Sequence, residues 1–167
     1  MSGPEFDLAG GLGNAAGETE TPEGTYRRLF GQKANRRILA VIWATVDRDR
    51  LLAETGWAPA ENLPDDPFLG ASVAVVTSAT GEAIAVVEPA TEGRLAATLA
   101  RHGEGPVGEY VEAPIPLDAI GPAATAAGLV VGRPAAGPFG RSVIVLSGPV
   151  SGPHLVLVER SAGTIAR

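Results

Sequence analysis

Short runs of aliphatic and β-branched residues recur along the chain, and proline, glycine and acidic residues separate them. Runs of this kind predict β-strands. Residues 59–67 contain three prolines and two aspartates, so we expect a loop there. The predicted strands are at 37–45, 71–78, 82–87, 106–113, 129–131, 141–146 and 154–158.

Helices are predicted between these strands by their capping residues. Residues 46–55 precede a glycine that is suited to end a short helix. Thr91 is a good N-cap for a helix over 91–103, which finishes at a second glycine. An alanine-rich helix is expected within 118–128.

The chain repeats one pattern about seventy residues apart. The run from Asp66 to Val76 is echoed by the run from Gly137 to Leu146, and Ile84-Ala85-Val86-Val87-Glu88 is echoed by Leu155-Val156-Leu157-Val158-Glu159. A repeat of this length indicates two fused copies of one small module. The predicted organisation is a flexible tail (1–25), a basic lead-in segment (26–36), a first βαβββ module (37–90), a linking helix (91–103) and a second βαβββ module (104–161).

Composition excludes several classes of site and partner. The chain has no cysteine, which excludes disulfides, thiolate nucleophiles and sulfur-ligated metals. A net charge of −6 argues against general nucleic-acid binding. We recognise no membrane-spanning run and no secretory leader, so we expect a cytoplasmic protein.

One segment departs from the acidic average. Residues 26–37 carry four arginines and one lysine and no acid. This segment can contact a phosphate or an acidic partner, but a solvated lead-in to the first strand is the commoner explanation.

Two motifs resemble a known family. The first motif is a strand, a helix and a glycine-rich connection, and it resembles the same segment of methylmalonyl-CoA epimerase-like proteins. It consists of Val86-Val87-Glu88-Pro89, the predicted helix and Ala100-Arg101-His102-Gly103-Glu104-Gly105. The second motif, at 44–50, resembles the first strand-to-helix turn of these proteins. Together with the repeat, the chain from Arg37 to Arg160 resembles the vicinal oxygen chelate superfamily, which includes glyoxalase I, extradiol dioxygenases and bleomycin-binding proteins. The resemblance implies an α+β fold in which two tandem βαβββ modules form curved mixed sheets with an open cup.

The same resemblance assigns the metal-binding positions of the family. Its ligands are His, Glu or Gln, and their positions fall on Ala40, Ala85, Gly108 and Val156. None of these residues has a side-chain donor, so we expect neither a metal ion nor another cofactor. An alternative set, Glu109, Glu159 and His154, requires a one-residue register slip in two strands, because the two acids alternate to the opposite face.

Strand alternation predicts which side chains line the cup. In the first module these are small or aliphatic: Ala40, Ile42, Ala44, Ala83, Ala85 and Val87. In the second module they include three polar groups, Tyr110, Glu112 and His154, beside Gly108, Val156 and Val158. An apolar cup with a few polar groups is typical of a small-molecule site.

Two main functions remain open at this point. One is a metal-independent module that binds a fairly apolar small molecule in the second-module cup, against Ala40, Ile42, Ala85, Gly108 and Val156, with Arg141 facing either an anionic ligand or a surface acid. The other is a cofactor-free isomerase, cyclase or lyase that uses Tyr110, Glu112 and His154 for acid–base chemistry. A scaffold without a ligand is a third interpretation.

Each of the three polar residues also has a structural interpretation. Tyr110 can serve only in packing, Glu112 can be solvated at a strand end, and His154 can lie in a loop. We expect a homodimer, with a monomer as the alternative, and no nucleic-acid or membrane partner.

Overall fold

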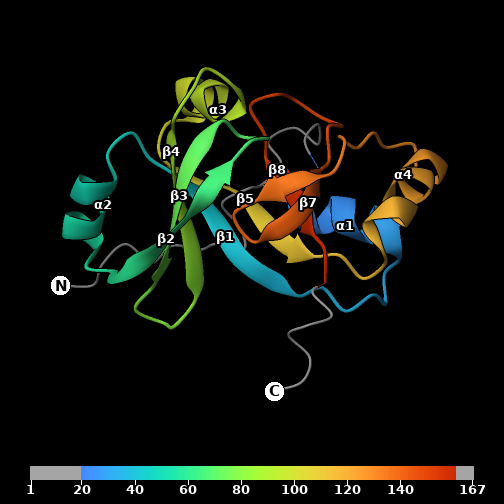
Figure 1. The fold of residues 1–167 in the computed structure, drawn as a ribbon, viewed down its shortest axis with the longest axis horizontal. Helices are drawn as coiled ribbons and strands as arrows, with labels where there is room; N and C mark the ends of the chain where they lie inside the picture. Colours follow the sequence, from blue (N-terminus) through green and yellow to red (C-terminus); the bar gives the residue numbers. More distant parts are fainter. Residues whose placement is uncertain (1–19, 161–167) are drawn as a thin grey trace.

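The computed structural model describes residues 20–160, which form one curved eight-stranded sheet with four helices around it (Figure 1). The strands lie in the order β2-β3-β4-β1-β5-β8-β7-β6. The end strands β2 and β6 contact each other, so the sheet is nearly closed. The expected tail at 1–19 and the final residue of the second module lie outside the described range.

The first module contains β1 (Ile38–Ala44), α2 (Arg48–Thr55), β2 (Ala58–Asp66), β3 (Ala71–Thr77) and β4 (Ala83–Pro89). The second contains β5 (Gly105–Glu112), α4 (Leu117–Ala126), β6 (Ala135–Gly137), β7 (Gly140–Ile144) and β8 (His154–Val158). Helix α3 (Arg94–His102) links them, and α1 (Pro22–Phe30) precedes both. The predicted α+β fold of two βαβββ modules is therefore confirmed.

The two modules share one register, which explains the sequence repeat. Ile42 lies opposite Ala85 in the parallel pair of β1 and β4, and Tyr110 lies opposite Val156 in the parallel pair of β5 and β8. The modules join through the antiparallel pair of β1 and β5, in which Ile42 faces Gly108. Ile42 and Tyr110 are therefore equivalent positions, as are Ala85 and Val156.

Three clusters of buried apolar residues lie on the two faces of the sheet. The inner, concave face is packed against Leu95 and Leu99 of α3. On the outer face of the second module, α1 and α4 cover one cluster. On the outer face of the first module, Trp43, Leu51 and Trp57 form another beneath α2. Figure 1 shows α2 at one end of the molecule and α1 and α4 at the other.

The start of the chain is more ordered than expected. The predicted tail to residue 25 is wrong at its end, because α1 begins at Pro22. Thr21 is the N-cap, and its side chain accepts a hydrogen bond of 3.0 Å from the Gly24 amide. Proline fits the first helical position because its missing N–H would have no partner there.

The basic stretch at 26–37 is largely paired within the chain. Arg28 contacts Glu20, Arg36 contacts Glu109, and Arg37 contacts Glu112. These intramolecular pairs account for three of its charges, which the sequence had left available for a phosphate, an acidic partner or solvent.

Two further expectations about local structure are wrong. The predicted loop at 59–67 is mostly strand β2, whose prolines are tolerated because β2 is an edge strand with only one neighbour. Thr91 does not cap α3, because the helix starts at Arg94 with Gly93 in the cap position. No described helix is long and apolar enough to cross a membrane.

Candidate functional site on the inner face of the sheet

Strand alternation placed most of the predicted cup-facing residues on the inner face, but it was wrong for Ala83, which is exposed, and the inner-face cluster does not include Glu112. Ala40, Ile42, Ala85 and Val156 are all buried in the inner-face cluster and exposed by at most 1%. Gly108 lies beside Ile42 in the register. The positions assigned to metal ligands therefore face inward, and they carry methyl groups, an isopropyl group or hydrogen.

The donor set on this face does not fit a metal ion. Within the described part of the chain, no three His, Cys, Asp or Glu side chains lie close enough to hold one. The alternative set is separated by the sheet: Glu109 contacts Arg36 and Glu159 contacts Arg141, whereas the His154 ring contacts Thr98 of α3.

A buried carboxyl–phenol pair lies on the inner face. The Tyr110 hydroxyl donates a hydrogen bond of 2.5 Å to Asp66 Oδ2, and both residues are exposed by at most 1%. Asp66 Oδ1 accepts from the amides of Phe68 and Leu69 at 2.7 and 3.0 Å. The pair joins the modules, because Asp66 ends β2 and Tyr110 lies on β5.

Burial controls the ionisation of this pair. Desolvation raises the pKa of Asp66 above its ordinary value, although the hydrogen bonds from Tyr110, Leu69 and Phe68 oppose the shift. Desolvation and the neighbouring Asp66 carboxylate raise the pKa of Tyr110 well above its ordinary value. Asp66 is therefore a group that can hold or release a proton at milder pH than an exposed aspartate.

A phenylalanine ring packs on the pair. The ring centroids of Phe139 and Tyr110 are 4.9 Å apart, and Phe139 is only partly buried. Phe139 lies in the turn between β6 and β7, and Phe68 occupies the equivalent turn between β2 and β3. Both phenylalanines pack against the inner-face cluster.

His154 is a strand residue held in a neutral form. Thr98 Oγ1 donates its proton to the Arg94 carbonyl at 2.7 Å, so His154 Nε2, 2.9 Å from the same oxygen, is the donor in its own bond. Burial, followed by the charges of Arg94 and His102, lowers the pKa of His154 to about 4. The ring is therefore uncharged near neutral pH.

The other predicted polar site residues do not join this pair. Glu112 ends β5, where its carboxylate contacts Arg37 at 3.1 Å and Arg160 at 2.8 Å. Arg141 is half exposed and contacts Asp118 and Glu159. Tyr110, Glu112 and His154 therefore do not contact one another: Tyr110 bonds to Asp66, Glu112 pairs with Arg37 and Arg160, and His154 bonds to Thr98.

Comparison with solved structures identifies the architecture. A hypothetical protein from Bacillus halodurans is 15% identical, with a TM-score of 0.60 over 77% of this chain and 96% of that one. A variant Streptomyces coelicolor methylmalonyl-CoA epimerase, in complex with 2-nitronate-propionyl-CoA, is 22% identical, with a TM-score of 0.58 over 75% and 98%. This chain has the vicinal oxygen chelate fold.

A further methylmalonyl-CoA epimerase, in complex with methylmalonyl-CoA and NH4+, supports the same fold. It is 21% identical, with a TM-score of 0.59 over 77% of this chain and 97% of that one. No protein-family model matches the chain, and no curated protein matches it. At this level of identity the structural similarity shows the fold alone, and the chemistry has to be argued from the residues of this chain.

Sequence reasoning missed Asp66, the partner of Tyr110 in this version of the fold. The prolines around Asp66 predict a loop, and strand alternation predicts nothing for the residues of a loop. A weak signal existed, because an aspartate two residues before Phe68 can accept from the following amides in an Asx turn. Nothing in the sequence linked it to a tyrosine on another strand.

Proposed function

We propose that the protein binds a small, largely apolar, uncharged molecule against the inner face of the second module, without a metal ion. The hydrogen-bonded pair of Asp66 and Tyr110 is the observation that carries this proposal. It is a polar pair inside an otherwise apolar cluster, and such a combination fixes the orientation of a small ligand. An anionic ligand is disfavoured, because it would lie beside a buried carboxyl group.

The ligand reaches the pair by displacing Phe139. This ring is partly exposed and packs directly on Tyr110, whereas Ala40, Ala44 and Ala85 of the same buried cluster have small side chains. Movement of one side chain therefore opens room beside the Tyr110 hydroxyl. A ligand carbonyl would accept from that hydroxyl in place of Asp66.

The test uses acetophenone, a neutral aromatic ketone, titrated into the protein and followed by calorimetry. We expect Phe139→Ala to raise the affinity by about tenfold, because the ring no longer has to be displaced. Tyr110→Phe, made in the Phe139→Ala background, should remove most of this gain. Absence of binding in both the wild-type protein and Phe139→Ala would exclude the inner face as the site.

The repeat supplies a matched control. Phe68→Ala makes the same truncation in the first module, where the position equivalent to Tyr110 is Ile42. This variant should gain no affinity that depends on Tyr110. Equal gains in the two variants would show that acetophenone fills any new cavity, and the proposed role of the pair would be wrong.

A second candidate function is proton transfer on such a ligand. The raised pKa of Asp66 favours it, because a carboxyl group with this shift is suited to general acid–base chemistry. Asp66 would remove a proton from the carbon beside the carbonyl and return it, while Tyr110 donates to the carbonyl oxygen. No cofactor is required for this exchange.

Deuterium exchange separates binding from turnover. An enzyme should incorporate deuterium from D2O into the methyl group of acetophenone, and Asp66→Asn should lower the rate by about a hundredfold or more. A binding protein should show no exchange above the rate in buffer, with affinity retained in Asp66→Asn.

The homodimer and the cytoplasmic location stay predictions.

A further inference from the structure

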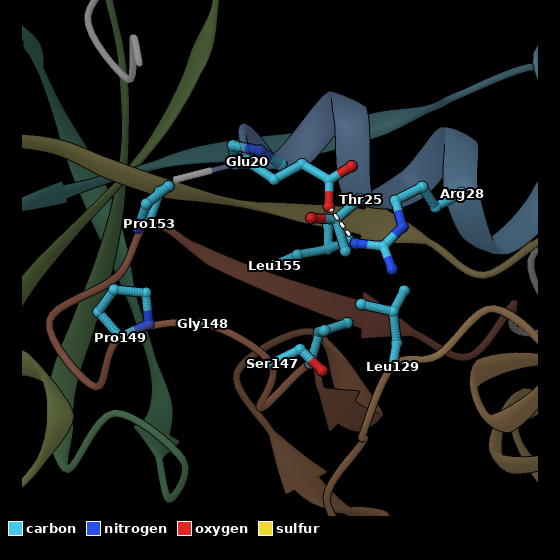
Figure 2. Close-up of a pocket in the computed structure, with 11 residues that line it drawn as sticks. Glu20, Thr25, Arg28, Leu129, Ser147, Gly148, Pro149, Pro153 and Leu155 are labelled. Atoms are coloured by element: carbon cyan, nitrogen blue, oxygen red, sulfur yellow. Dashed lines mark hydrogen bonds and ion pairs between the residues drawn. The ribbon is translucent and has the colours of Figure 1, made fainter. Parts of the chain in front are cut away.

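A pocket of about 220 Å³ lies on the outer side of the second module, away from the inner face. One helix face of α1 forms one wall, and the connection between β7 and β8 forms the other (Figure 2). The floor consists of Leu129, Val145 and Leu155, all buried in the outer-face cluster beneath α1 and α4. The pocket therefore combines an apolar floor with an open mouth.

The mouth carries one cation and one acid. Arg28 Nη1 contacts Glu20 Oε2 at 2.7 Å, and Arg28 Nη2 donates to the Ala127 carbonyl at 2.9 Å. The Ala127 contact anchors the guanidinium at the C-terminal end of α4, where carbonyl groups favour a cation. Among the described lining residues, Glu20 is the sole carboxylate and Arg28 the sole cation.

Two hydroxyl groups complete the polar rim. Thr25 lies on the same helix face as Arg28, and Ser147 lies across the pocket from them (Figure 2). Ser147 Oγ accepts from the Val130 amide at 2.7 Å, which leaves its proton free to donate. Figure 2 shows Glu20 and Arg28 meeting above Thr25, with Leu155 beneath.

We propose that this pocket binds a compact amphipathic carboxylate, with Arg28 as its anchor. The Glu20 side chain already presents a carboxylate to the guanidinium, and arginine is suited to planar, two-point recognition of that group. The ligand carboxylate takes the place of Glu20, and its apolar body packs on the leucine and valine floor. Glu20 is therefore an internal competitor.

The size of the pocket limits the ligand. Drug-sized sites have volumes of roughly 300–1,000 Å³, so a pocket of about 220 Å³ suits a single ring or a short alkyl chain. The prolines at 149 and 153 add flat apolar walls, which favour an aromatic body. Benzoate has both the charge and the shape, and benzamide has the shape without the charge.

Calorimetric titration of the full chain with benzoate tests this proposal. Glu20→Gln should raise the affinity for benzoate by about fivefold, because the competitor loses its charge, and Arg28→Gln should lower it by about tenfold or more. A gain of affinity cannot result from unfolding, so the Glu20 variant remains informative if Arg28→Gln is unstable. Arg28→Lys should fall between Arg28→Gln and the wild type.

Glu23→Gln is the matched control for Glu20→Gln. Glu23 lies on α1 and contacts Arg27 and Arg36, and it does not line the pocket. This variant should bind benzoate as the wild type does. Equal affinities for benzoate and benzamide, no response to Arg28→Gln, or no binding even in Glu20→Gln would each overturn the proposal.

Discussion

The two modules have the same strand register and differ in the side chains at equivalent positions. At equivalent inner-face positions the first module has Ile42 and the second has Tyr110, which reaches across to Asp66 at the end of β2. Two residues earlier on the same strands, Ala40 corresponds to Gly108. The strand pairing is therefore the same in both modules, whereas at these equivalent positions only the second module has a polar side chain.

The outer sides of the modules differ more. In the first module β3 and β4 are joined by a tight turn, in which the Ser78 amide donates to the Glu82 carbonyl at 2.9 Å. In the second module the connection from β7 to β8 runs through 145–153 and forms a wall of the pocket beneath α1. Longer connections and added helices are where one copy of a repeat acquires features that the other lacks.

The largest expected effect comes from filling Gly108. A Cβ built there would lie 2.2 Å from the His154 carbonyl oxygen, so the backbones of β5 and β8 would have to separate. Gly108→Ala should destabilise the protein by about 3 kcal/mol or more, and Ala40→Gly, at the equivalent position, by only about 1 kcal/mol. Urea unfolding measures both, and similar losses would contradict the asymmetry.

The next effect depends on pH and on His154, whose equivalent in the first module is the exposed Ala83. The folded pKa of His154 is about 4 against 6.5 when unfolded, so the unfolded state binds more protons between these values. Stability should fall as pH drops from about 6.5 to 4, by up to about 3 kcal/mol.

His154→Gln is the variant that tests this dependence, since it keeps a donor and removes the titrating group. The free energy of unfolding of this variant should vary less between pH 7 and pH 4 than that of the wild type. An unchanged slope would show that other groups cause the acid sensitivity.

Breaking the pair between the modules should have a moderate effect. Tyr110→Phe leaves Asp66 Oδ2 buried without its donor and should cost about 2 kcal/mol. Ile42→Val, a conservative change at the equivalent position, should cost about 1 kcal/mol. A double-mutant cycle with Asp66→Asn isolates the coupling, and additive losses would mean that the hydrogen bond contributes nothing to stability.

The smallest effect is expected at Glu112. Its two partners, Arg37 and Arg160, are 71% and 62% exposed, so solvent and salt screen both contacts. Glu112→Gln should cost less than about 1 kcal/mol, and the difference should shrink further in 0.5 M NaCl. A larger loss that persists in high salt would show that Glu112 contributes more than a surface ion pair.

Period-two alternation was enough to assign the inner face of the central strands. Ala40, Ile42, Ala85 and Val156 lie there because consecutive side chains of a strand point to opposite faces. Trp43, the neighbour of Ile42 in the chain, lies on the outer face, where its ring packs edge-on against Trp57 with centroids 5.1 Å apart. The apolar core of the fold is therefore readable from the sequence.

The edge strand β2 and the start of helix α1 were harder to predict from the sequence, for physical reasons. Strand β2 is paired on one side only, so prolines and acids that exclude a central strand are allowed in it. The start of α1 had a usable signal in Thr21-Pro22, which the glycine-rich composition before it obscured. The pair of Asp66 and Tyr110 depends on how the curved sheet brings β2 over β5, and no local pattern encodes that curvature.

The central position of β8 also bears on how the chain is made. Strand β5 has β1 on one side and β8 on the other, yet β8 is the last of the eight strands to be synthesised. His154 is the first residue of β8, and its ring is hydrogen-bonded to Thr98 of the linking helix α3. A nascent chain that lacks β8 would thus leave one edge of β5 unpaired and would leave α3 without its contact to His154.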